Sequence, residues 1–462
     1  MDISEIPIIN DTDKAIDFPL ADEGVEQELR KHGAPIRIEG EDADARRERL
    51  RNILEPSNHT FDDINEEQSG EDEDKDLEDD EIFYTPGDAK LYDARVEILH
   101  DSMKRSSQRI HKLKERAKEQ DFTRVLKNRR HINSKLASYS LYGSQFIPGI
   151  TRAISSIRFS KRSDLIACGS WDGSINILDS SSLNDKYKSG PGFHTEKVSA
   201  LDWNFATEEN SLVSGGNEGT INFWRLNQEE DKKLSPTESI KDAHNMRITK
   251  TLFHPRGNYI ISTSFDQTWK LWDTNTSTCL LQQEGHSKEV FSGSIHPDGS
   301  LFASGGLDGM CYIWDLRSGR FIADLRKHVK GIYSVDWSPN GYHLATASGD
   351  CSVKIWDLRR IDRTNEELFS IPAHSKLVSE VRFFHRRESN DALTKDVALD
   401  SNGSFLVTSS YDGLINVWSA DNWIKVNTLR GHNDKVMACD ISGDGTWIAS
   451  SGWDRSVKLW GI

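Results

Sequence analysis

Residues 285–315 read GHSKEVFSGSIHPDGSLFASGGLDGMCYIWD, and this stretch decides the fold. It opens on the pair Gly285-His286, reaches Asp308 22 residues after the histidine, and reaches Trp314 six residues later. A short apolar segment with small residues leads into the turn that holds Asp308, and the five residues up to Trp314 then alternate in polarity. Short alternating strands separated by tight turns predict an antiparallel sheet.

The same spacing recurs through the C-terminal two-thirds of the chain. An acidic residue stands six positions before a tryptophan at Trp224, Trp272, Trp314, Trp356, Trp418 and Trp460, and Asp172 keeps this spacing to Leu178. The histidine of the sixth unit, His374, stands 38 residues before its aspartate, which predicts an insertion within 385–402. A period of 40–45 residues with Gly-His and Trp-Asp pairs resembles the WD40 repeat. The resemblance implies an all-β fold, a seven-bladed propeller over residues 141–462, because one four-stranded sheet cannot bury its faces alone.

Each repeat also contains the residue types of a hydrolase triad, since a Ser or Thr precedes the acidic residue by four positions. Recurrence in nearly every unit favours a structural role, and the resemblance implies buried hydrogen-bonded tetrads. We expect no catalytic residue, no enzyme activity and no cofactor. The five cysteines form no CxxC pair, so no zinc site is expected either. The expected tetrad residues include His286, Ser304, Asp308, Trp314, His328, Thr346, Asp350, Trp356, His432, Ser450, Asp454 and Trp460.

The ends of the repeat array predict how the ring closes. The chain ends two residues after Trp460, so the last sheet lacks an outer strand. An open sheet edge exposes unpaired backbone groups. The segment Leu141–Ile147, just before the first repeat, is the expected donor of the missing strand.

Charge is distributed unevenly in a chain of net charge −16. Residues 1–88 carry −20, residues 89–149 carry +8 and residues 150–462 carry −4. The chain is acidic as a whole, but residues 89–149 are basic. The charge of this segment is compatible with a nucleic-acid partner. No apolar run approaches the roughly 20 residues of a membrane helix, and the first twenty residues are acidic where a signal peptide is basic. We expect an intracellular protein with reduced cysteines.

Residues 29–54 read LRKHGAPIRIEGEDADARRERLRNIL, a Gly-Pro turn followed by a helix with an acidic start and a basic continuation. This charge order suits the helix dipole, and a solvated amphipathic helix is one interpretation. The stretch also resembles the splicing-factor motif of the Prp4 family of pre-mRNA-processing proteins. The matching residues are Leu29, Arg30, Gly33, Pro35, Ile36, Gly40, Glu41, Asp42, Arg46, Arg47, Arg49, Leu50 and Arg51.

The order of segments agrees with that family along nearly the whole chain. We expect a disordered tail, the motif, an acidic linker, a basic long helix and the propeller, at residues 1–26, 27–54, 55–88, 89–140 and 141–462. Residues 55–81 combine high charge with few large apolar side chains, which predicts disorder in the absence of partners.

The predicted helix carries an apolar stripe along a heptad seam, formed by Tyr92, Val96, Leu99, Met103, Ile110, Leu113 and Ala117, with Ser106 in the polar slot. Such a stripe suits packing on protein along one side. The other faces are basic and are candidates for contact with RNA phosphates or with a partner. A merely solvated helix is the alternative. The basic residues are Lys104, Arg105, Arg109, Lys112, Lys114, Arg116, Lys118, Lys127, Arg129 and Arg130.

The top face of the propeller is the second candidate interface. In WD40 geometry, the residue before each turn aspartate and the residue after the opening apolar position of each first strand surround the central opening. Large apolar side chains there would anchor a protein partner, although some could instead pack on one another. The residues at these positions are Trp171, Phe265, Phe291, Tyr333, Tyr411, Met437 and Trp453.

The family resemblance implies a non-enzymatic scaffold in pre-mRNA splicing, located in the nucleus. The implied partners are a pre-mRNA-processing factor 3 type protein, other proteins of the U4/U6.U5 particle, the U4/U6 small nuclear RNA either directly or indirectly, and a cyclophilin. The alternative function is that of a substrate receptor for a cullin-type ubiquitin ligase. Its support is a Trp-Asp-x-Arg box, present at residues 314–317 and 356–359.

Overall fold

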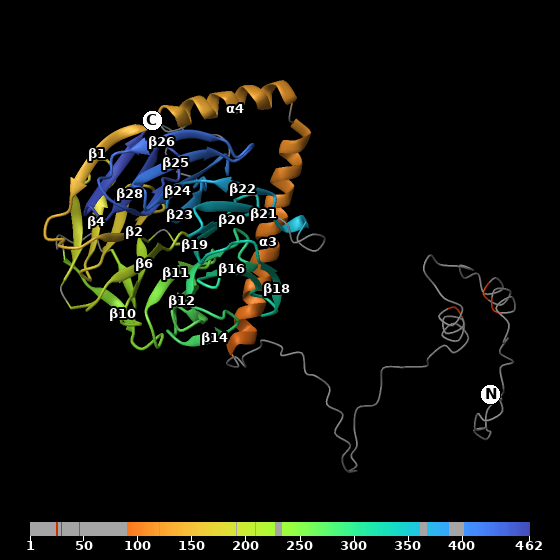
Figure 1. Cartoon of the computed structure of the whole chain (residues 1–462). Helices are drawn as coiled ribbons and strands as arrows, with labels where there is room; N and C mark the ends of the chain where they lie inside the picture. The colour runs from red at the N-terminus through yellow and green to blue at the C-terminus, as the bar shows by residue number, and fades with distance from the viewer. Residues whose placement is uncertain are drawn as a thin grey trace, which may run out of the picture. The chain divides into compact units, whose positions relative to one another are not determined.

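The computed structural model describes residues 90–119, 121–190, 192–207, 209–226, 233–360, 367–387 and 402–462, together with Val25, Leu29 and Arg46. The expected disordered tail apart from Val25, the acidic linker and most of the insertion within 385–402 lie outside these residues. Val25 is helical and buried, so the structure does not support disorder at this position. The chain divides into two units, residues 1–78 and 79–462. The described residues of the second unit form two α-helices, followed by seven mainly antiparallel sheets arranged in a ring (Figure 1).

The seven sheets are the seven blades of a β-propeller, which confirms the predicted fold class. The first three blades are formed by β2 (Ile154–Phe159), β3 (Leu165–Ser170), β4 (Ile175–Asp179) and β5 (Asp185–Ser189); by β6 (Val198–Trp203), β7 (Ser211–Gly216), β8 (Ile221–Arg225) and β10 (Pro236–Ile240); and by β11 (Ile248–Phe253), β12 (Tyr259–Ser264), β13 (Trp269–Asp273) and β14 (Cys279–Gln283). A short strand, β9 (Lys233–Leu234), pairs in parallel with β5 of the first blade.

The other four blades repeat this order from the centre of the ring outward. They are formed by β15 (Val290–Ile295), β16 (Leu301–Gly306), β17 (Cys311–Asp315) and β18 (Phe321–Leu325); by β19 (Ile332–Trp337), β20 (His343–Ser348), β21 (Ser352–Asp357) and β22 (Phe369–Pro372); by β23 (Val378–Phe383), β24 (Phe405–Ser410), β25 (Leu414–Ser419) and β26 (Lys425–Arg430); and by β27 (Val436–Ile441), β28 (Trp447–Gly452), β29 (Ser456–Gly461) and β1 (Ser140–Phe146). A 3-10 turn, η1 (Leu358–Arg360), follows β21.

The core of the ring lies between neighbouring blades. One apolar cluster joins Ile313 of the fourth blade to Ile332 and Trp337 of the fifth, and all three side chains are buried. The indole nitrogen of Trp337 donates to the carbonyl oxygen of Ser294 in the preceding blade at 3.1 Å. Both faces of each middle strand are therefore covered, which explains why these short strands are almost continuously apolar.

The ring closes through β1, which pairs antiparallel with β29 from Ser140 opposite Gly461 to Phe146 opposite Ser456. The outer strand of the last blade thus comes from the segment before the first blade, at the position that the sequence predicts to within one residue. The hydroxyl of Tyr139 donates to the carbonyl oxygen of Gly445. The strand before the first blade, β1, and the last strand of the chain, β29, therefore belong to one sheet.

The predicted single long helix over 89–140 is wrong, because two helices occupy this segment. They are α3 (Lys90–Glu119) and α4 (Phe122–Ala137). Asp121 has an extended backbone, and its carboxylate accepts hydrogen bonds from the amide and the hydroxyl of Thr123, at 3.2 and 2.7 Å. An aspartate in this position caps a new helix N-terminus, so the chain changes direction here.

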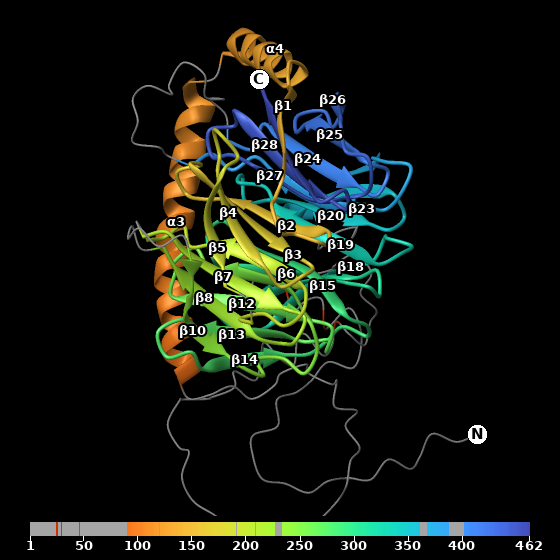
Figure 2. The ribbon, with the colours of Figure 1, turned by 90° about the vertical axis from the view of Figure 1, so that its left-hand side faces the viewer.

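The two helices contact different parts of the ring (Figures 1 and 2). α3 lies against the face that carries the turns between first and second strands, which we call the lower face. α4 packs on β26, where Leu136 is fully buried and Arg129 pairs with Asp421 at 3.0 Å. Asn427 donates to the carbonyl oxygens of Leu136 and Ala137 at the end of α4. These contacts hold α4 so that it leads directly into β1.

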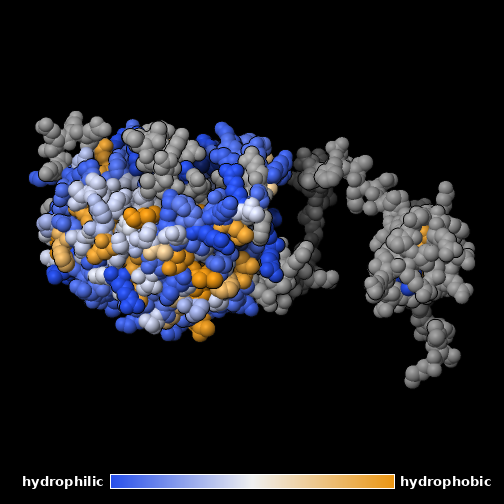
Figure 3. Space-filling model, turned by 90° about the horizontal axis from the view of Figure 1, so that it is seen from above, coloured by the Kyte–Doolittle hydropathy of each residue, from blue (hydrophilic) through white to orange (hydrophobic). Residues whose placement is uncertain are grey.

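Seen from the α4 side, the surface is mostly hydrophilic, with hydrophobic residues gathered in patches between the polar ones (Figure 3). None of the helices that the structure describes is long and apolar enough to cross a membrane.

Candidate functional site: the propeller mouth and the N-terminal helices

The His, Ser or Thr, acidic residue and Trp of six blades form hydrogen-bonded tetrads. In the fourth blade, His286 lies 3.0 Å from Asp308 through Nδ1 and 2.8 Å from the Ser304 hydroxyl through Nε2. The same hydroxyl accepts from the indole nitrogen of Trp314 at 2.9 Å and is fully buried, so it is not placed to attack a substrate. The other tetrads are His194–Ser214–Glu218–Trp224, His244–Ser262–Asp266–Trp272, His328–Thr346–Asp350–Trp356, His374–Thr408–Asp412–Trp418 and His432–Ser450–Asp454–Trp460.

The tetrad carboxylates predict acid sensitivity of the fold. Burial raises the pKa of Asp266, but hydrogen bonds from His244 and Thr268 outweigh it and lower the pKa to about 2. A carboxylate whose folded pKa lies below its unfolded value of about 3.9 stabilises the fold above that pH, and this contribution is lost as the pH falls towards 2. Asp266→Asn should therefore destabilise the ring at pH 7 and should lose less additional stability than the unsubstituted chain between pH 4 and pH 2. Thermal melts at several pH values measure this, and parallel curves for the two chains would contradict it.

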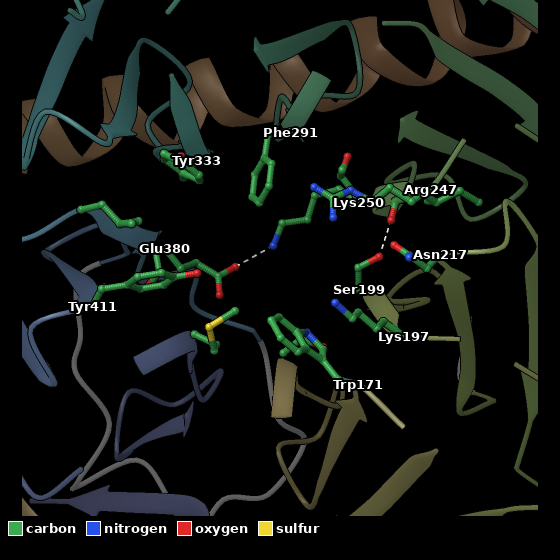
Figure 4. A pocket seen from close by; sticks show the side chains of 16 residues that line it. Trp171, Lys197, Ser199, Asn217, Arg247, Lys250, Phe291, Tyr333, Glu380 and Tyr411 are labelled. Atoms are coloured by element: carbon green, nitrogen blue, oxygen red, sulfur yellow. Dashed lines mark hydrogen bonds and ion pairs between the residues drawn. The ribbon is translucent and has the colours of Figure 1, made fainter. Parts of the chain in front are cut away.

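The mouth of the propeller lies on the upper face, which carries the turns between second and third strands. A cavity of about 270 Å³ opens there, and Figure 4 shows the side chains around it. On one side the ring of Phe291 contacts Tyr333 at 4.9 Å and Phe265 at 6.0 Å between ring centres. Tyr411 and Met437 continue this apolar side of the cavity. Phe265, Phe291 and Tyr333 thus form one row of rings, Trp171 contacts Trp453 at 5.3 Å between ring centres, and most of the predicted residues are half-buried.

Cations stack on the aromatic rings around this mouth. The Lys197 ammonium lies 4.1 Å from the Trp171 ring centre, and the Arg247 guanidinium lies 3.4 Å from that of Phe265. Lys435 lies 4.4 Å from the ring of Trp453. The Nε atom of Arg247 is buried and forms no hydrogen bond to the described residues. Such cation–aromatic pairs present positive charge beside an apolar surface, which suits an acidic ligand group next to an apolar one.

The floor of the mouth holds a buried ion-pair cluster. Lys250 lies 3.0 Å from Glu380 (Figure 4). The Glu380 carboxylate also contacts Arg382 at 2.9 Å and Arg158 at 3.4 Å. The backbone amide of Cys439 donates to the second oxygen of Glu380 at 3.1 Å. Breaking a buried pair of this kind leaves an unpaired charge and is strongly destabilising. The cluster therefore serves the fold, and the free positive charge of the mouth comes from Lys197, Arg247 and Lys435.

Hydroxyl residues take the place of the aromatic ones in four blades. At the position equivalent to Phe291, Thr249 donates to the carbonyl oxygen of Val290 at 2.8 Å, and Ser379 donates to that of Val436 at 2.8 Å. Ser155 and Ser199 bond in the same way to the opening residue of the next blade. These hydroxyls join neighbouring blades, so partner contacts at this position are left to Phe291, Tyr333 and Met437.

Sequence reasoning missed the cations of the mouth. Lys197, Arg247 and Lys435 each stand directly before the opening Val or Ile of a first strand. Lys197, Arg247 and Leu377 line the cavity from this position, so a basic residue before that Val or Ile is the signal that could have found the cations.

The basic helix residues fall into two groups, those that contact the propeller and those that are exposed away from it. Arg109 forms a bidentate pair with Asp298, with distances of 3.0 and 2.6 Å, and donates to the carbonyl oxygen of Asn340 at 2.7 Å. Arg105 pairs with Asp101 and donates to the carbonyl oxygen of Pro255. These guanidinium groups, and Arg129 on α4, contact carboxylate or carbonyl groups, and the pairs of Arg109 and Arg129 join the helices to the propeller. The exposed members of the predicted set are Lys104, Lys112, Lys114, Lys118, Lys127, Arg129 and Arg130, and the side chain of Arg116 lies outside the described part of the chain.

Two residues of the predicted splicing-factor motif are described. Leu29 and Arg46 are both helical and buried. The remaining motif residues lie outside the part of the chain that the structure describes.

Comparison with known proteins gives relatives that extend beyond the propeller. The family model for the WD domain, G-beta repeat, matches residues 143–179, 236–273, 277–315, 319–357, 365–419 and 423–461. The U4/U6 small nuclear ribonucleoprotein PRP4 of Saccharomyces cerevisiae is 45% identical over 426 residues, which cover 92% of this chain and 87% of that protein.

Two further relatives match shorter parts of the chain. An uncharacterized WD repeat-containing protein of Schizosaccharomyces pombe is 36% identical over 259 residues, or 54% of this chain and 53% of that protein. A U4/U6 small nuclear ribonucleoprotein PRP4-like protein of Arabidopsis thaliana is 45% identical over 58 residues, or 13% of this chain and 10% of that protein.

Proposed function

Because this chain belongs to the Prp4 family of WD-repeat proteins, we propose that it is a non-enzymatic scaffold subunit of the U4/U6 and U4/U6.U5 small nuclear ribonucleoprotein particles. It acts in spliceosome assembly and pre-mRNA splicing, in the nucleus. The observation that carries this proposal is the 45% identity over 92% of the chain, which includes the segments before the propeller. A propeller alone would support a scaffold of any kind, because one fold hosts many functions.

The propeller mouth is the proposed docking site for a pre-mRNA-processing factor 3 type protein. Phe291 and Tyr333 offer an apolar surface, and Lys197 and Arg247 place positive charge beside it. A partner segment with an apolar side chain next to an acidic one fits both features. A cyclophilin is a second proposed partner, through the N-terminal region.

The alternative function, a cullin-type substrate receptor, is not favoured. Its Trp-Asp-x-Arg boxes are present, but Arg317 pairs with Asp315 at 3.0 Å and Arg359 pairs with Asp357 at 2.6 Å. Each arginine is thus already engaged by the aspartate of its own box. Affinity purification of the tagged chain, followed by sequencing of co-purified small RNA and identification of proteins, separates the two functions. Recovery of U4 and U6 RNA supports the splicing role, and recovery of cullin adaptors without RNA overturns it.

The exposed lysines at the C-terminal end of α3 are the proposed RNA-binding surface. Replacing Lys112, Lys114, Arg116 and Lys118 by Gln should lower the affinity for U4/U6 RNA transcripts. It should also flatten the salt dependence of binding, by roughly 0.7–0.9 units of slope for each phosphate that the variant no longer neutralises. Titrations at several salt concentrations measure both quantities.

The control for this variant removes four exposed cations from other parts of the surface, and it should bind RNA as the unsubstituted chain does. Equal affinity and slope in the two Gln variants would show that the four α3 cations are not the RNA contact of this chain. The control residues are Lys233, Lys241, Lys425 and Arg430.

A further inference from the structure

α3 binds the propeller through a face different from its heptad seam. Leu91, Ala94 and Ile98 are buried in one cluster with propeller residues, and Ser102 is buried one turn further along. Polar anchors continue this face, since Arg109 reaches Asp298. The groups that Arg105 and Arg109 contact belong to Pro255, Asp298 and Asn340. Each lies in the turn between the first and second strands of a blade, and the three blades are consecutive. The helix is therefore fixed to the lower face along much of its length.

The seam points away from the propeller. The exposed fractions of Tyr92, Leu99, Met103 and Ile110 are 74%, 37%, 58% and 44%. Val96 and Leu113 are half-buried, and Ala117 is exposed. Large apolar side chains of the seam are thus exposed on a face of α3 that lies about a quarter turn around the helix from the anchored face. A contiguous apolar strip of this kind marks an interaction site.

The spacing of the seam indicates what covers it. Its members alternate between steps of four and three residues from Tyr92 to Ala117, about 38 Å along the helix axis. A strict seven-residue repeat drifts around a straight helix by about 20° per repeat. The seam would therefore rotate away from a flat protein surface, and contact with that surface would end within a few turns. A second helix that supercoils around the first follows such a seam throughout.

Charge beside the seam indicates the kind of helix. Lys114 is exposed directly beside the seam, and Lys104 and Lys118 are exposed further around the helix on the same side as Lys114. α3 holds nine basic and five acidic residues, a net charge of +4, so two copies of this helix would repel each other. In a parallel pair of copies, Ser106 would also face Ser106 and leave two small side chains in the centre of the contact. A foreign helix can supply a large apolar residue there and acidic residues along its flanks.

We propose that the heptad seam of α3 is the docking site for an α-helix of another protein, one with its own apolar heptad repeat and acidic flanking residues. The two helices form a short two-stranded coiled coil on the lower face. The propeller mouth, on the upper face, stays open in this arrangement. The chain can therefore hold two partners at once, one on each face, and the seam does not depend on the function assigned to the mouth.

The test uses the full chain and a labelled synthetic peptide of four heptads, with Leu at the seam positions and Glu at the flanks. We expect saturable binding in fluorescence anisotropy and a gain of peptide helicity in circular dichroism. A peptide of the same seam with Lys at the flanks should bind at least tenfold more weakly. The double variant Leu99→Glu, Met103→Glu should also lower the affinity for the acidic peptide at least tenfold.

The matched control is Gln108→Glu, which adds negative charge at an exposed position of α3 outside the seam. This variant should bind the acidic peptide within about twofold of the unsubstituted chain, and all variants should melt at the same temperature. Absence of peptide binding, or equal weakening in the control and the seam variant, would overturn the proposal. So would a dimer of the unsubstituted chain in sedimentation that the seam variant abolishes, since a second copy would then be the occupant. Loss of U4/U6 RNA binding with retained peptide binding in the seam variant would assign the face to RNA instead.

Discussion

A chain that begins at residue 150 should melt at least about 10 °C below a chain that begins at residue 139, because only the shorter one lacks β1. A chain that begins at residue 89 should melt no lower than the one that begins at residue 139. All 29 described strands lie within residues 140–461, so the first truncation that removes a strand is the one that reaches β1.

The expected size follows from what β1 contributes. It pairs with β29 at six positions, and each net backbone hydrogen bond is worth about 0.5–1.5 kcal/mol. Ile147 and Ile150 are buried against the first and last blades and would be removed or exposed with the strand. Without β1, the edge of β29 would also be exposed to water and to other chains. A decrease of several kcal/mol is a large part of the stability of an ordinary domain.

Differential scanning calorimetry of the three chains measures the effect. A synthetic peptide of residues 139–150, added in excess to the shortest chain, should raise its melting temperature, because it can restore the missing strand. Equal melting temperatures for the chains that begin at 139 and 150 would show that the ring is held closed by contacts other than β1.

The fold could be predicted from the sequence because each blade repeats the same local pattern. The spacing from His286 to Asp308 and Trp314 reappears in blade after blade, so insertions and single replacements such as Leu178 do not hide it. The break between α3 and α4 was missed although its signal is local. Asp121 with Thr123 two residues later is a helix N-cap, and an otherwise uninterrupted helical pattern obscured it.

The faces of α3 show where local sequence stops being sufficient. The heptad seam identifies an apolar side of the helix, but it does not say which surface will cover it. The propeller instead packs against the side with Leu91, Ala94 and Ile98. Arg109 on the same side of the helix bonds to Asp298, which is 189 residues away in the sequence. Contacts of such separation leave no periodic signal. The same reason explains why three predicted RNA-contact arginines turned out to anchor helices.

The mouth was predicted in part, since position along the repeat identifies which residues surround the opening. Phe291, Tyr333 and Tyr411 line the cavity as that rule expects. The rule could not say that Phe265, Phe291 and Tyr333 would pack in a row, because this depends on side-chain rotation in neighbouring blades. It also did not predict the stacked cations, which give the mouth its positive charge.

Replacing Phe291 and Tyr333 together by Ala should weaken binding of the pre-mRNA-processing factor 3 type protein by about 100-fold or more. A truncated interface aromatic can cost about 2 kcal/mol or more, and each factor of ten corresponds to about 1.4 kcal/mol. The centres of the two rings lie 4.9 Å apart. The losses of binding free energy in the two single variants should therefore not add up to the loss in the double variant. Calorimetric titration of the purified partner into the four chains of this double-mutant cycle measures both the weakening and the coupling.

The same variants should leave the ring intact, because both side chains are half-exposed at the mouth and lie outside the clusters between blades. Phe369→Ala is the matched control, since this phenylalanine is 42% exposed on the outer strand β22, away from the mouth. It should change the partner affinity by less than about twofold. If the double variant binds as tightly as the control, the partner does not dock at the mouth. Lys197 and Arg247 would then not bind an acidic group of this partner. The α3 seam on the lower face would become the principal protein-binding surface of the chain.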